Sequence, residues 1–66
     1  MSDKKNKLRD SFQELKNSIE SAETRLNQFI EKDNKSAGTD VRKYMQDVKQ
    51  YAQLVRELVQ EIKNAQ

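Results

Sequence analysis

Two heptad repeats separated by a short break are the feature that most limits how this chain can fold. In the first half, apolar residues recur at alternating spacings of four and three with no slip. That spacing places them along one stripe of an α-helix. We therefore predict a helix from about residue 4 to about residue 32. Its a positions are Phe12, Ile19 and Leu26, and its d positions are Leu8, Leu15, Ala22 and Phe29.

The second half repeats the pattern with a wider stripe. Apolar residues again alternate at spacings of three and four, and a third apolar row runs beside the first two. Three rows are the width expected of a helix in a bundle rather than in a two-stranded coiled coil. We predict this helix over about residues 39–65. Its a row is Val41, Val48, Val55 and Ile62, its d row is Tyr44, Tyr51, Leu58 and Ala65, and its e row is Met45, Ala52 and Val59.

A charged segment, EKDNKSAGTDVRK at residues 31–43, joins the two stripes and holds the only glycine of the chain. We predict that the connection itself covers about residues 33–39. Short helix–helix connections produce antiparallel neighbours. The sequence therefore predicts an all-α fold, in which residues 1–66 form a single antiparallel two-helix hairpin of coiled-coil type.

The start of the second helix has two interpretations. Thr39 can serve as the N-cap, which leaves Gly38 in the loop. Alternatively, Ala37 continues the d row of the second stripe, which favours a start at Asn34 or Ser36. Gly38 would then lie in the first helical turn, at a cost of roughly 1 kcal/mol relative to Ala.

The charges at the g positions support an antiparallel arrangement, because the g rows of two antiparallel helices face each other. The first helix has mostly basic g residues and the second has mostly acidic ones. The predicted contacts are Lys32 with Asp40 and Arg25 with Asp47. Each exposed pair contributes only a few tenths of a kcal/mol, so its main effect is on orientation.

The e row of the second helix has no obvious cover within a hairpin. A two-helix protein with an uncovered apolar row is expected to self-associate. We therefore predict a homodimer that forms a four-helix bundle. The residues predicted to lie at the dimer interface are Met45, Ala52, Val59, Tyr44 and Tyr51.

The composition argues against several classes of function. The chain has no Cys and no His, which excludes Cys/His zinc sites and histidine acid–base catalysis. One glycine cannot form a phosphate-binding loop. Acidic pairs at helical spacing are typical of solvated surfaces. We expect no enzyme activity, no metal, no cofactor and no small-molecule substrate. No apolar run is long enough to cross a membrane, so a cytoplasmic location is expected.

A row of basic residues on the second helix is the strongest functional signal. Lysine or arginine recurs every seven residues at the b positions, and no acidic residue interrupts the row. At 1.5 Å per residue the row is roughly 31 Å long. Such a row suits contact with the phosphates of nucleic acid. The alternative is that the side-chain stems merely cover the apolar stripe. The row comprises Arg42, Lys49, Arg56 and Lys63.

The segment NK-x-AGT-x-x-RK, with Arg56 and Leu58 further on, resembles the bacterial histone-like family of linker-histone-like, chlamydial type. The resemblance covers roughly residues 31–58. It implies a DNA-associated, nucleoid-compacting role without strong sequence preference. Two positions depart from the family pattern: Asp33 stands where the family tends to have Gly, and Asp40 stands where a basic residue is usual. The resemblance points to Lys32, Lys35, Arg42, Lys43 and Arg56 as DNA-binding residues.

Two functions follow as hypotheses. The first is a small histone-like nucleoid protein that binds DNA through phosphate contacts. The second is a helical protein–protein interaction or scaffold module that uses the wide apolar stripe for a partner helix and binds no nucleic acid. The predicted nucleic-acid-binding residues are Lys32, Lys35, Arg42, Lys43, Lys49, Arg56 and Lys63.

Overall fold

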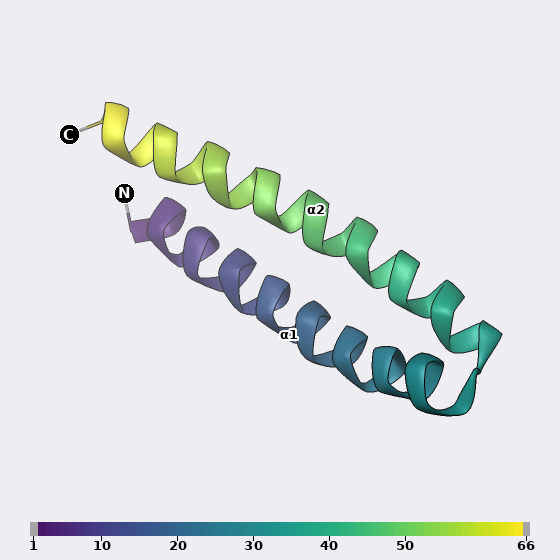
Figure 1. Ribbon diagram of the computed structural model, residues 1–66. Coiled ribbons are helices and arrows are strands. Elements are labelled where there is room, and N and C mark those ends of the chain that lie inside the picture. The colour runs from purple at the N-terminus through teal and green to yellow at the C-terminus, as the bar shows by residue number, and fades with distance from the viewer. Residues whose placement is uncertain (1, 66) are drawn as a thin grey trace.

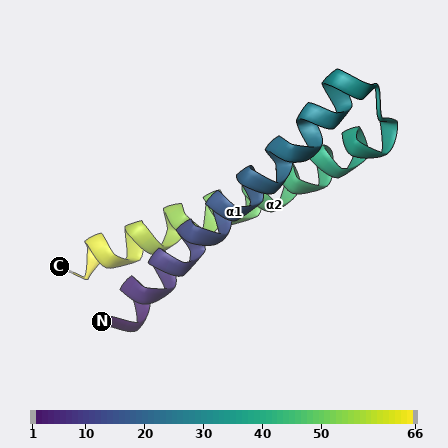
Figure 2. The ribbon, with the colours of Figure 1, turned by 90° about the horizontal axis from the view of Figure 1, so that it is seen from below.

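The computed structural model describes residues 2–65, and they form two long antiparallel helices. Helix α1 spans Ser2–Lys32 and helix α2 spans Lys35–Asn64. They lie side by side along their whole length, with the chain ends together at one end of a rod of 50 × 14 × 12 Å (Figure 1). Viewed from below, the helices cross at a shallow angle (Figure 2). The all-α hairpin predicted from the heptads is confirmed.

The turn between the helices contains only Asp33 and Asn34, so the connection predicted over residues 33–39 was too long. Asn34 is the N-cap of α2: its backbone is extended, and its side-chain Oδ1 accepts a hydrogen bond from the Ala37 N–H at 3.2 Å. Asp33 reverses the chain with a φ of 50°, in the left-handed region. The side chain of Asn34 therefore settles the two interpretations in favour of the early start.

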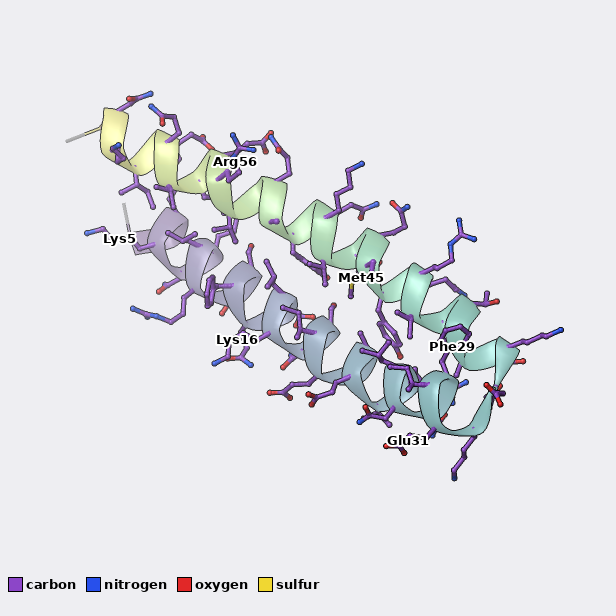
Figure 3. The ribbon with its side chains drawn as sticks, in the orientation of Figure 1. Lys5, Lys16, Phe29, Glu31, Met45 and Arg56 are labelled. Atoms are coloured by element: carbon purple, nitrogen blue, oxygen red, sulfur yellow. The ribbon has the colours of Figure 1, made fainter. Side chains whose placement is uncertain are left out.

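The first turn of α2 contains Gly38, and the Phe29 ring occupies the space where a side chain at this position would lie. A Cβ atom built on Gly38 would lie 2.7 Å from two ring atoms of Phe29. The ring lies between the end of α1 and the beginning of α2 (Figure 3). Ala37, the neighbour that continues the d row, has no exposed surface at all. Two small residues thus let the helices approach each other closely at the tip.

The register of the helices differs from the predicted one by one heptad. Arg25 donates from Nε and Nη2 to Oδ2 of Asp40, and Lys4 Nζ lies 3.3 Å from Oε1 of Glu61. In both pairs the residue numbers add up to 65. The predicted pairs, Lys32 with Asp40 and Arg25 with Asp47, were wrong. The predicted pairs required a turn centred on residue 36. The observed turn of two residues is centred earlier in the chain, so each α2 residue lies beside an α1 residue nearer the start of α1 than predicted.

The core of the hairpin is thin. Among residues 3–65, the buried apolar residues are Ala22, Ala37 and Leu58. Ser11 is also buried, and its hydroxyl donates to the Lys7 carbonyl at 2.7 Å, so its burial leaves no unmet hydrogen bond. Helix α1 therefore turns its d and g rows toward α2. Its a row, which the heptad pattern predicted to be covered, remains exposed: Phe12, Ile19 and Leu26.

Candidate nucleic-acid interface

The basic row, Arg42, Lys49, Arg56 and Lys63, runs along the exposed outer side of α2. All four side chains are exposed because the b positions of a helix lie well away from its d row. Arg56 extends from α2 in the direction away from α1 (Figure 3). Within residues 2–65, none of the four forms an ion pair. The row therefore presents its charge to solvent.

The surface beside the middle of the basic row is polar and uncharged. Lys49 shares a shallow hollow with Gln46, Gln50 and Gln53. Glutamine amides donate hydrogen bonds without adding negative charge. An anion that approaches Lys49 here would meet further hydrogen-bond donors and no carboxylate among these hollow-lining residues.

The turn brings two further predicted residues together. Lys32 ends α1 and Lys35 begins α2, and both side chains are exposed. The exposed Asp33 lies between them in the chain. Glu31, at the same end, points away from α2 (Figure 3). The tip therefore carries nearly balanced charge, and the basic row is the more strongly cationic surface.

Lys43 is the predicted site residue that the structure separates from the basic row. It lines a small hollow with Asp40, Tyr44 and Asp47. That hollow belongs to the long side where Arg25 pairs with Asp40, which we call the ion-pair face. Its other ion pair is Lys4–Glu61. Two carboxylates beside Lys43 reduce the local positive potential.

The opposite long side is hydrophobic, and we call it the apolar face. It contains two hollows, one between the middle of α1 and the first half of α2, and one nearer the chain ends. Large side chains from both helices line them and are 39–52% exposed. These residues define the face: Phe12, Ile19, Leu26, Met45 and Val59.

The five residues predicted for a dimer interface do not all share this face. Met45 and Val59 line its hollows, and Ala52 lies between them in the same row and is half-buried. Tyr44 lines the hollow on the ion-pair face instead. Tyr51 is half-buried.

A second basic group on α1 was missed by the sequence prediction. Lys5, Arg9 and Lys16 line the hollow of the apolar face that lies nearer the chain ends, together with Phe12. Lys16 extends from the outer edge of α1 (Figure 3). Their spacings of four and seven place them on one side of a helix, and that signal was available from the sequence.

Among residues 2–65, no three His, Cys, Asp or Glu side chains gather where they could hold a metal ion. Neither helix has a stretch apolar and long enough to span a bilayer, as judged over the same residues.

The family comparison supports the resemblance seen in the sequence. The family model described as histone H1-like protein Hc1 matches residues 9–65. The match extends beyond residues 31–58, on which the resemblance rested, and covers most of α1. No curated protein and no solved structure gives a significant match to the chain. Since the family model covers far more than half of its residues, the chain belongs to the histone H1-like protein Hc1 family.

Proposed function

We propose that this protein binds duplex DNA in the nucleoid through phosphate contacts, without reading base sequence. The observation that carries the proposal is the exposed basic row on α2, which has no ion-pair partner among residues 2–65. Membership of a histone H1-like family supports the choice of DNA as the polyanion. Histone-like proteins act as structural components of chromatin, so no chemical reaction is proposed.

The dimensions of the row agree with this function. Its length of roughly 31 Å is close to one turn of duplex DNA, about 34–36 Å. Two of its four members are arginines, whose planar guanidinium groups can bind phosphate oxygens in pairs. Lys32 and Lys35 at the tip can add contacts where DNA passes the turn.

Few phosphates are neutralised by one chain, so affinity should be modest and steeply dependent on salt. If all four residues of the row contact phosphates, the slope of log K against log salt should be about −3.6. The test is a titration of the pure protein with random-sequence duplex DNA at several salt concentrations. An absence of binding even at low salt would remove the proposal.

A matched pair of variants locates the interface. Lys49→Glu reverses a charge in the basic row, whereas Lys7→Glu makes the same change at an exposed position of α1 away from the row. Lys49→Glu should weaken binding strongly and reduce the salt slope by about 1. Lys7→Glu should have a much smaller effect. Circular dichroism verifies that both remain helical. Equal effects would mean that only net charge matters and that the row is not the interface.

A scaffold function without DNA is the second candidate, and the exposed apolar face favours it. Large exposed apolar patches commonly mark surfaces that bind other proteins. The salt titration distinguishes the two functions, because a scaffold module would show no binding to random duplex DNA.

A further inference from the structure

We propose that Lys49 and three glutamines around it form a phosphate seat, which holds one phosphate group of the DNA backbone. The glutamines are Gln46, Gln50 and Gln53, and the four residues line one shallow hollow at the middle of α2. Lys49 supplies the positive charge, and the glutamine amides donate uncharged hydrogen bonds. This role of the glutamines rests on the proposed function, because it assigns part of the same DNA contact to neutral side chains.

The spacing of these residues gathers the four side chains on one patch of the helix. Gln46 lies three residues before Lys49, and Gln53 lies four residues after it. Residues at these spacings are neighbours on a helical surface, about 5–6 Å apart at Cβ. Gln50 follows Lys49 directly and lines the same hollow. An anion that contacts the Lys49 ammonium therefore lies close to the carboxamide groups.

The amides of the phosphate seat have hydrogen-bond donors to offer. Each glutamine carboxamide has two N–H donors. Among residues 2–65, neither Gln46 nor Gln50 donates its amide to another side chain. Gln53 donates from Nε2 to Oε1 of Glu57 at 3.3 Å and keeps a second N–H. Glutamine is among the residues that commonly donate to phosphate oxygens in protein–DNA complexes.

The next heptad of α2 has the same spacing and different chemistry. Seven residues on, Arg56 and Glu57 take the positions of the lysine and of the glutamine that follows it. The Glu57 carboxylate already accepts the Gln53 amide, and Gln60 donates to Asn64 at 3.1 Å. A phosphate near Arg56 would therefore meet a negative charge and amides that are already bonded.

The preceding heptad also lacks the arrangement. There the corresponding position belongs to Lys43, which lines a hollow with Asp40 and Asp47. Within the basic row, Lys49 is thus the member with glutamine at all three neighbouring positions. We therefore expect Lys49 to make the strongest single contact of the row.

The phosphate seat divides the affinity into two parts that can be measured separately. The Lys49 ammonium replaces a counterion on the DNA, so removing its charge should reduce the salt slope by about 1. The glutamines carry no charge. Loss of one amide should therefore lower the affinity by the same factor at every salt concentration and leave the slope unchanged.

Fluorescence anisotropy with random-sequence duplex DNA over a salt series measures both parts. Gln50→Ala should weaken binding about threefold to tenfold at each salt concentration. Gln13→Ala is the matched control on α1, where the amide donates to Asn17 at 3.0 Å, and it should leave the affinity unchanged. Alanine favours helix more than glutamine does, and circular dichroism verifies that both variants stay helical. Equal effects of the two variants would overturn the phosphate seat.

A gain of affinity should result from building the same arrangement around Arg56. Glu57→Gln and Glu57→Ala remove the same negative charge, but only Glu57→Gln supplies an amide at that position. Glu57→Gln should bind duplex DNA about threefold more tightly than Glu57→Ala. Equal affinities would show that only the charge at this position matters, and they would contradict a role for the amides.

Glutamine amides can also bond base edges, those of adenine above all. Duplexes made only of A·T pairs and only of G·C pairs distinguish the two targets. A phosphate contact predicts that Gln50→Ala loses the same factor on both duplexes. A loss confined to A·T pairs would place the amides on base edges and overturn the phosphate seat.

The proposed function and the phosphate seat fail in distinguishable ways. A wild-type chain that binds no duplex DNA at low salt would remove the proposed function. Binding that is weakened by Lys49→Glu and unaffected by Gln50→Ala would retain the function and overturn the phosphate seat.

Discussion

The two long faces of the hairpin differ in how far the chain completes them by itself. On the ion-pair face, Arg25 binds Asp40, and the buried Ser11 hydroxyl is satisfied by the Lys7 carbonyl. On the apolar face, Phe12 and Met45 remain about half exposed. Polar contacts thus define the register on one side, whereas the other side retains apolar surface that the hairpin does not cover.

The largest effect is expected from truncating two side chains that are adjacent in sequence, one buried by the hairpin and one on its apolar face. Leu58 is 3% exposed and Val59 is 39% exposed. Leu58→Ala should lower the free energy of unfolding by about 2–5 kcal/mol, which is enough to unfold much of so small a domain. Val59→Ala should cost well under half of that at low protein concentration, where association contributes least.

Urea denaturation followed by circular dichroism measures both variants, at low and high protein concentration. If a second copy covers the apolar face, the cost of Val59→Ala should grow with concentration, because the side chain would then be buried in the dimer. Equal costs for the two variants at low concentration would mean that the hairpin already covers both faces.

A second test concerns the tip, where the Phe29 ring lies against Gly38. Gly38→Ala places a Cβ at 2.7 Å from the ring, so it should destabilise the protein by about 1–2 kcal/mol despite the better helix propensity of alanine. In a Phe29→Ala background the same change should instead stabilise it by up to about 1 kcal/mol.

The change of sign between the two backgrounds is the decisive result. It is measured as the shift of the urea midpoint in a double-mutant cycle. If Gly38→Ala stabilises the wild-type chain, the ring moves aside without cost. The glycine would then be unrelated to the closure of the tip.

Much of the hairpin was predictable, since the heptads identify both helices and the continuation of the d row to Ala37 indicated the early start of α2. The register of the two helices was not predictable, because it depends on whether Asn34 caps α2. Several polar residues nearby, such as Ser36 and Thr39, could have done so with similar energy. A difference of a few residues in the turn moved the predicted partner of Asp40 by a whole heptad.

The candidate site was predictable in part for a related reason. The basic row follows from its period of seven alone, whatever the register. The exposure of Phe12 does not follow from the heptad period, because a and d positions look equivalent in sequence. Which row of α1 faces α2 is decided by packing, and the small side chains of Ser11 and Ala22 allow the d and g sides to approach closely.

A third, smaller effect is expected in the turn. Asp33 has a φ of 50°, a conformation that glycine adopts without steric cost. Asp33→Gly should therefore stabilise the hairpin by about 0.5–1 kcal/mol, and Asp33→Ala should destabilise it. Both variants remove the same negative charge, so they separate backbone strain from electrostatics. Thermal unfolding measures them, and equal shifts for both would show that charge, not conformation, controls this position.

The smallest effect should come from the ion-pair face and concerns its register. Arg25→Asp and Asp40→Arg should each destabilise the chain slightly, and the double exchange should restore about half a kcal/mol. Lys32→Asp should give no such restoration when combined with Asp40→Arg, because Lys32 was paired with Asp40 only in the predicted register. The coupling should diminish in high salt, since both side chains are about one-third exposed. A coupling of Asp40 with Lys32, and none with Arg25, would support the predicted register and its longer turn. It would also move the basic row relative to α1 and thereby change which residues border the apolar face.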